Sequence, residues 1–214
     1  MDSIKNSAGK AVLLKMVAAI QQNKDYLGEV DGLIGDGDHG MNMNKGFTMF
    51  GDQIRKKEIG FTGGLNELGN LLFSRIGGSM GPIYGTTFMG MAECGEKFDV
   101  IDLKSFAAML GAGLSNLQDV VPARVGDKTL IDTLCPANDA IQKAAKEGKS
   151  FADALKDMKA AAEAGRDSTK NLVAKFGRSS RLGERSRGVL DAGSVSCCLI
   201  LCAMADGILE QIGA

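Results

Sequence analysis

Residues 31–47 read DGLIGDGDHGMNMNKGF, and this stretch decides how the whole chain is interpreted. Three carboxylates, those of Asp31, Asp36 and Asp38, fall within eight residues, and the glycines between them let the backbone turn tightly. Carboxylates on a glycine-rich loop, without cysteine ligands nearby, suit a hard cation such as Mg²⁺, which is commonly shared with substrate phosphates. The alternative is an acidic surface loop with turn glycines. The loop alone leaves both interpretations open.

Helical periodicity extends from this loop in both directions. A stripe of apolar residues at spacings of three and four precedes the loop and fades after Asn23, and further stripes follow it. Asp102 and Asp127 stand where helix N-caps are expected, and Pro136 should kink or interrupt the helix that starts near Asp127. The other expected helices cover residues 12–20, 41–57, 65–76, 82–93, 103–117, 151–162 and 193–212.

About eight helices and no strand indicate an all-α chain, because alternation of period two is absent. Most connections are short, so sequential helices should be antiparallel neighbours. No linker, repeat or low-complexity tract interrupts the pattern. The sequence therefore predicts one domain that spans residues 1–214.

Composition excludes several classes of partner. The net charge is −1, with 25 basic and 26 acidic residues, which gives no electrostatic case for binding nucleic acid or an anionic membrane. No signal peptide is evident at the N-terminus, and the most apolar run, residues 195–205, is shorter than the roughly 18 residues of a membrane span. Five cysteines without a CxxC pair indicate a reduced, cytoplasmic protein without structural zinc.

Two glycine-containing turns could bind phosphate. GGSMGP at residues 77–82 precedes an expected helix, whose first N–H groups attract anions, although such a sequence also simply separates two helices. GDKT at residues 126–129 has the wrong order for a Walker A loop, and no strand precedes it. An N-capping role for Asp127 is the simpler interpretation, and Lys128 remains available to a phosphate.

A long irregular segment near the C-terminus is rich in arginine. Residues 175–193 read KFGRSSRLGERSRGVLDAG and carry Arg178, Arg181, Arg185 and Arg187. A solvated charged loop is the ordinary interpretation, but irregular segments of this length in compact domains are usually functional or disordered. Together with the carboxylates and the two turns, this segment favours a nucleotide-handling kinase without a P-loop, since phosphoryl transfer mainly needs positioning and charge neutralisation.

These segments resemble a known family. GDGDHGMNMNKGF, GGSMGPIYG, GDKT and GRSSRLGERS followed by DAG are similar, in order and spacing, to the nucleotide-binding subunit of dihydroxyacetone kinases, the L subunit or second kinase domain. The resemblance covers essentially the whole chain. It implies an antiparallel eight-helix up-and-down barrel with ADP or ATP at one mouth.

The resemblance also implies a set of site residues. Asp31, Asp36 and Asp38 would hold two Mg²⁺ ions that bridge the nucleotide phosphates. No residue is assigned as catalytic with certainty, and Arg178 is the candidate for stabilising the transferred phosphate. The residues expected around the nucleotide are His39, Gly40, Met41, Asn42, Gly78, Ser79, Met80, Gly126, Thr129, Leu130, Arg178, Asp191, Ala192 and Gly193.

The single histidine bears on the substrate. In the family that this chain resembles, the ketose is held covalently on a histidine of another subunit, and His39 is the only histidine here. The resemblance therefore implies a ketose-binding partner subunit. A freestanding chain favours a system in which a phosphohistidine phosphotransferase subunit recharges bound ADP, although a split ATP-dependent enzyme stays open. The oligomeric state, including a homodimer, stays open as well.

Two segments depart from the family pattern. This chain has VVPARVGDKT where RGKAEPGDKT is common, and GVLDAGS where GHxDPGA is common. Both are expected near the nucleotide mouth. They suggest an altered partner or substrate, such as a tetrulose, and a nucleotide-state module that signals to a transcription activator is a further alternative.

Overall fold

The computed structural model describes residues 2–214, and helices dominate them. Two three-residue strands, β1 (Ser3–Lys5) and β2 (Val100–Asp102), pair antiparallel, with Ile4 opposite Ile101. Three 3-10 segments are η1 (Asn6–Ala8), η2 (Thr169–Asn171) and η3 (Arg178–Ser186). The α-helices are α1 (Lys10–Gln22), α2 (Lys24–Ile34), α3 (His39–Ile54), α4 (Phe61–Arg75), α5 (Met80–Gly95), α6 (Leu103–Val120), α7 (Ile131–Glu147), α8 (Phe151–Ser168) and α9 (Ala192–Ile212).

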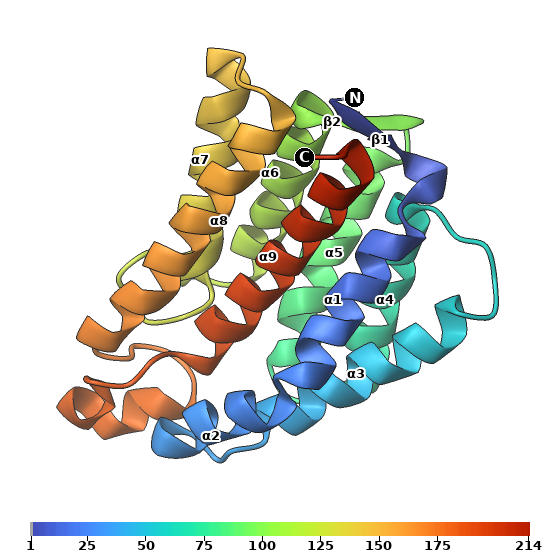
Figure 1. The fold of residues 1–214 in the computed structure, drawn as a ribbon. Helices are drawn as coiled ribbons and strands as arrows, with labels where there is room; N and C mark the ends of the chain where they lie inside the picture. Colours follow the sequence, from blue (N-terminus) through green and yellow to red (C-terminus); the bar gives the residue numbers. More distant parts are fainter. Residues whose placement is uncertain (1) are drawn as a thin grey trace.

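Eight of these helices close into a ring. Each packs against the next in the order α1, α3, α4, α5, α6, α7, α8, α9, and α9 returns to α1 (Figure 1). The remaining helix, α2, lies across one end, against α3, α9 and η3. The predicted all-α class is confirmed, with an eight-helix ring as its main part.

The connections alternate between the two ends of the ring. The α3–α4, α5–α6 and α7–α8 connections lie at the end that also holds both termini (Figure 1). The α4–α5, α6–α7 and α8–α9 connections lie at the other end, where α2 and the acidic loop join α1 to α3. This up-and-down path gathers four segments remote in sequence at one end of the molecule.

Aromatic and aliphatic stripes fill the interior of the ring. The predicted stripe of α1, from Val12 to Ile20, is fully buried, and so are the largest aromatic side chains of the core. The rings of Phe106 and Phe151 join α6 to α8, with centroids 5.8 Å apart. The predicted cap of α6 is confirmed, because Asp102 Oδ1 accepts from the Ser105 N–H at 2.8 Å and the Ser105 hydroxyl accepts from the Asp102 N–H.

Three local predictions were wrong. Residues 24–34 form α2, so Asp31 lies on a helix and the acidic loop narrows to residues 35–38. Asp127 caps nothing, since α7 begins at Ile131 and Leu130 occupies the cap position without a side-chain bond. Helix α7 continues through Pro136, so the proline does not interrupt it, and the kink stays a prediction. The prediction of no strand missed β1 and β2, which are too short to show alternation.

Helix α9 is the one described helix that is long and apolar enough to cross a membrane. It corresponds to the helix predicted at residues 193–212, and the apolar run of residues 195–205 is part of it. However, about two thirds of its most apolar window is buried in the protein, and it packs against α1, α7 and α8. These contacts are those of a core helix.

Candidate functional site

A cavity of about 580 Å³ opens at the end of the ring where α2 lies. It is lined by residues of the acidic loop and its flanking helices, the 77–84 segment, the 121–130 connection and the 176–193 connection. Of the residues predicted for the site, those that line the cavity are Asp31, Asp36, Asp38, His39, Asn42, Gly78, Ser79, Met80, Thr129, Leu130, Arg178, Asp191, Ala192 and Gly193.

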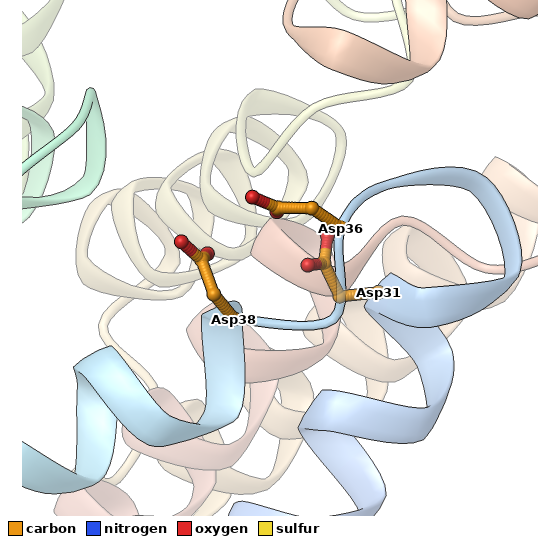
Figure 2. A group of neighbouring side chains, drawn as sticks. All are labelled: Asp31, Asp36 and Asp38. Carbon is orange, nitrogen blue, oxygen red and sulfur yellow. The ribbon is translucent and has the colours of Figure 1, made fainter.

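The three carboxylates converge at this cavity. Asp31 comes from the last turn of α2, Asp36 from the loop and Asp38 from the position before α3, and one oxygen of each lies within 4.8 Å of the others. Figure 2 shows the three carboxyl groups turned toward the same space. Gly37 permits this approach, because its φ of +76° suits glycine and it packs directly on Gly28 and Gly32 of α2.

This cluster has the chemistry of a hard-cation site. Three like charges at such short separation repel one another, and a divalent cation with oxygen ligands relieves that repulsion. The donor set contains carboxylate oxygens alone, which fits Mg²⁺ better than a soft metal. In the structure the guanidinium of Arg178 forms an ion pair with Asp36, so part of the negative charge is already compensated from η3.

His39 begins α3 beside the acidic cluster. Its backbone N–H donates to Asp31 Oδ2 at 3.4 Å, and its ring Nε2 lies 2.8 Å from the Ser196 hydroxyl of α9. Burial lowers the pKa of His39 to about 4, although the Asp31 carboxylate acts in the opposite direction. The imidazole is therefore neutral near pH 7.

Two helix starts face the cavity. The N–H groups of the first turn of α5 follow Gly78, whose φ is +72°, and Ser79 places no side-chain cap on them. At the start of α9, Asp191 caps the helix by accepting from the Ser194 N–H at 2.7 Å. Burial raises the pKa of Asp191 to about 6, against the lowering effects of the Ser194 N–H and nearby Lys128. The uncapped start of α5 is thus the more suitable one for a phosphate.

Lys128 is buried and its amine is already bonded. The ammonium donates to the carbonyls of Thr169, at 2.6 Å, and of Val189, and its backbone has a φ of 60°. Burial lowers the pKa of this lysine. A phosphate-binding role was left open for Lys128 by the sequence. The structure instead shows it joining the 121–130 connection to both ends of the α8–α9 connection.

Three predicted site residues lie outside the cavity lining. Gly40 packs against α2, where a Cβ would lie 1.9 Å from the Lys24 carbonyl oxygen. Met41 is 67% exposed, on the face of α3 that turns to solvent. Gly126 instead donates its backbone N–H to Asp132 at 2.6 Å.

The cavity also includes residues that received no role from the sequence. Tyr84 and Ile83 follow the GGSM turn, and Phe176 precedes Arg178. Tyr84 belongs to the GGSMGPIYG motif, and its place in that motif is the one sequence feature that could have assigned it to the site. Ile34 and residues 121–123 carry no chemical signal, since apolar lining looks like core until the fold is known.

Comparisons with known proteins agree with this geometry. The family described as "DAK2 domain" matches residues 33–206. The ADP-binding subunit DhaL of PEP-dependent dihydroxyacetone kinase 1 from Listeria innocua is 35% identical over 186 residues, which cover 86% of this chain and 88% of that protein. The corresponding DhaL subunit from Escherichia coli is 34% identical over 184 residues, or 85% of this chain and 87% of the other.

A solved structure supports the fold. The dihydroxyacetone kinase from C. freundii, in complex with AMP-PNP and Mg²⁺, superposes with a TM-score of 0.71 at 19% identity. The match covers 95% of this chain but 34% of that longer protein. With the family match over most of the chain and two relatives of similar length, the chain belongs to the DAK2-domain family.

Proposed function

We propose that this chain is the ADP- or ATP-binding subunit of a dihydroxyacetone-type ketose kinase. It passes a phosphoryl group from the Mg-bound nucleotide to a ketose held covalently on a separate subunit. The observation that carries the proposal is the meeting of three carboxylates with the uncapped start of α5 in one cavity. The nucleotide-binding function in the names of the similar DhaL subunits agrees with it.

Each part of the cavity has a role in this proposal. Asp31, Asp36 and Asp38 hold two Mg²⁺ ions, which supply charge neutralisation for the nucleotide phosphates. The N–H groups that follow Ser79, together with His39 and Asn42, donate to phosphate oxygens. Arg178 turns from Asp36 to the transferred phosphate, where a planar guanidinium stabilises developing charge. The base and ribose lie against Met80, Thr129, Leu130 and the 191–193 turn.

The ketose requires a partner in this scheme. His39 is the only histidine of the chain, and its Nε2 is bonded to Ser196 inside the protein. In this proposal the imidazole faces the nucleotide phosphates, which leaves no histidine of this chain to hold the ketose. The ketose is therefore presented by another subunit that covers the mouth.

Exposed apolar side chains support such docking. Most of the exposed large hydrophobic residues of the described chain belong to segments around the mouth, and exposed apolar patches commonly mark interaction sites. They are Leu33, Met41, Phe73, Val120, Val125 and Phe176.

In this proposal the phosphoryl group comes from another protein and not from free ATP. The relatives from Listeria innocua and Escherichia coli are named as subunits of PEP-dependent kinases. By analogy, a phosphohistidine phosphotransferase subunit recharges ADP that stays bound to this chain in the cytoplasm. A homodimer is compatible with this scheme but is not required by it.

A tetrulose is the alternative substrate. The segments that depart from the family pattern, residues 120–129 and 188–194, both border the cavity mouth, where a partner and its sugar approach. Reconstitution with the ketose-binding subunit, assayed over dihydroxyacetone and both erythruloses, separates these substrates. Capture of a DNA-binding protein alone, in the ADP or ATP state, favours a regulatory module instead.

Calorimetry of the full chain with ADP and Mg²⁺ tests the nucleotide function. Binding should depend on Mg²⁺ and should weaken strongly in Asp36→Asn. Asp25→Asn is a matched control, because Asp25 is an exposed carboxylate at the far end of the same helix, α2. Absence of MgADP binding by the unmodified chain, or phosphorylation of a free ketose by this chain alone, contradicts the proposal.

A further inference from the structure

A hydrogen-bonded network of buried hydroxyls lies in the wall of the cavity. The Ser196 hydroxyl of α9 lies 2.7 Å from the Tyr84 hydroxyl of α5 and 2.8 Å from Nε2 of His39, at the start of α3. Both hydroxyls also lie 3.1 Å from the Gly193 carbonyl oxygen. Ser196 is fully buried and Tyr84 is 4% exposed, so water does not compete for these bonds.

The network fixes which ring nitrogen of His39 can meet a ligand. Nε2 points inward to Ser196, whereas Nδ1 has no hydrogen-bond partner among the described residues. Every buried side-chain nitrogen and oxygen of those residues has a partner, so Nδ1 is accessible to solvent. Because His39 lines the cavity, Nδ1 is the ring nitrogen available to a bound phosphate.

The hydrogen bonds of the ring select one tautomer. His39 lines the cavity at the start of α3, where its backbone N–H donates to Asp31, and Nε2 is the ring nitrogen that contacts Ser196. A phosphate oxygen accepts hydrogen bonds and donates none, so the ring nitrogen that meets it must carry the hydrogen. The hydrogen on Nδ1 then requires Nε2 to accept, with the Ser196 hydroxyl as donor.

The Tyr84 hydroxyl supplies the remaining hydrogen of the network. Once Ser196 donates to His39, its oxygen accepts from the Tyr84 hydroxyl, and this uses the two shortest contacts of the network. Each hydroxyl can also donate to the Gly193 carbonyl oxygen, but these contacts, at 3.1 Å, are the longer ones of the network. The two shorter contacts favour donation from Tyr84 through Ser196 to His39.

We propose that Tyr84 and Ser196 are positioning residues that hold His39 with Nε2 as acceptor, so that Nδ1–H is presented as a donor to the nucleotide phosphates. This role rests on the proposed nucleotide function for its ligand, whereas the tautomer itself is a property of the chain without nucleotide. The hydroxyls act through His39 and do not contact the phosphate.

The experiment uses the single histidine. In the full chain labelled with ¹⁵N-histidine, long-range ¹H–¹⁵N spectra contain one imidazole, whose nitrogen shifts report its tautomer. The unmodified chain should show protonated Nδ1 and unprotonated Nε2, without and with MgADP. Ser196→Ala should move the ring toward the Nε2–H form, and Tyr84→Phe should give a smaller movement in the same direction.

Matched variants separate positioning from folding. Tyr84→Phe keeps the ring that stacks on Phe88, at a centroid distance of 6.1 Å, and removes only the hydroxyl. Tyr26→Phe is the control, because Tyr26 is the one other tyrosine and is 44% exposed. It should leave both the spectrum and MgADP binding unchanged. Loss of the oriented donor should weaken MgADP binding about fivefold to tenfold in Ser196→Ala.

The outcomes distinguish this inference from the proposed function. An Nε2–H tautomer or an imidazolium in the unmodified chain at neutral pH overturns the inference, and so does an unchanged spectrum in Ser196→Ala. Calorimetry of the unmodified chain with MgADP is independent of these spectra. If that chain shows the Nδ1–H tautomer but binds no MgADP, the nucleotide function fails while the network stands as a device for orienting His39.

Discussion

The guanidinium of Arg178, in η3, is ion-paired with the carboxylate of Asp36 in the acidic loop. The arginine-rich segment is thereby attached to the acidic cluster, although the two are far apart in the sequence. Both partners are partly solvent-exposed, with side-chain exposures of 63% and 37%, so the pair is weak and exchangeable. A contact of this strength can be replaced when a cation and a phosphate enter together.

Replacing Arg178 should therefore have opposite effects on two ligands. Arg178→Gln frees Asp36 from a competing positive charge, so Mg²⁺ without nucleotide should bind about twofold to fivefold more tightly. MgADP should bind more weakly, because a phosphate contact is lost. Titration calorimetry with each ligand measures both effects.

Arg181→Gln serves as the control for this change. It removes the same charge from the same 3-10 segment, but Arg181 forms no ion pair within the described residues. It should alter neither affinity by more than about twofold, since exposed charges are largely screened. Weaker Mg²⁺ binding in Arg178→Gln would contradict the idea that Arg178 and Mg²⁺ compete for Asp36.

Lys128 should contribute to stability through its two carbonyl contacts. Lys128→Ala leaves the carbonyls of Thr169 and Val189 without their charged donor, which should cost about 2 kcal/mol. Lys128→Gly loses the same contacts but relieves the strain of a φ of 60°, so it should be about 1 kcal/mol more stable than Lys128→Ala. Denaturant unfolding of the variants measures this order, and a less stable glycine variant would contradict it.

Asp127 should make stability depend on acid pH. The hydrogen bond from Lys175 and the backbone N–H of Arg124 lower the pKa of Asp127 from its usual 3.8. Its contribution is therefore fully present above pH 3.8 and is lost as the pH falls through the lower folded value. The difference in unfolding free energy between the unmodified chain and Asp127→Asn should be constant near neutral pH and should shrink below about pH 4. A difference that grows with acidity would contradict this assignment.

The fold followed from the sequence wherever apolar spacing was uninterrupted. The stripe of α1 and the Asp102 cap appear as predicted, because local periodicity and capping chemistry decide such elements without help from neighbours. Helix α2 was missed although Leu27, Val30 and Ile34 keep helical spacing. Its glycines look like turn residues in sequence, but in the structure they allow close packing on the acidic loop.

The α7 region was misjudged for a related reason. Asp127 lies four residues before the first residue of α7, Ile131, and its carboxylate is used by tertiary contacts, whereas Asp132 lies inside the first turn. Asp127 bonds Lys175 from the α8–α9 connection, while Asp132 accepts from the N–H groups of Gly126 and Thr129. Pro136 leaves the Asp132 carbonyl without its helical donor, and this carbonyl lies against Gly165, where a Cβ would come within 2.2 Å of it. None of these contacts is visible in a linear pattern.

The glycine at position 40 shows how a motif residue can serve packing. It was expected among the nucleotide contacts, yet its Cα faces α2, where a Cβ would lie 1.9 Å from the Lys24 carbonyl oxygen and 2.7 Å from the Gly28 nitrogen. Both neighbours are backbone atoms, which cannot move aside as a flexible side chain would. Gly40 therefore sets how closely α2 approaches α3 and, through that approach, where Asp31 lies relative to Asp38.

Gly40→Ala should separate these helices and destabilise the chain by about 3 kcal/mol or more, or about 6–12 °C in Tm. Gly63→Ala is the matched control, because Gly63 is an exposed position in the first turn of α4 and its Cβ would meet only Ile59 Cγ1, at 3.7 Å. That change should be neutral or stabilising by up to about 1 kcal/mol, since alanine is the better helix former. Thermal unfolding measures both variants, and calorimetry should show weaker Mg²⁺ binding in Gly40→Ala as Asp31 moves away from Asp38. If Gly40→Ala keeps its Tm and loses only nucleotide affinity, Gly40 is a ligand contact after all and the packing role is wrong.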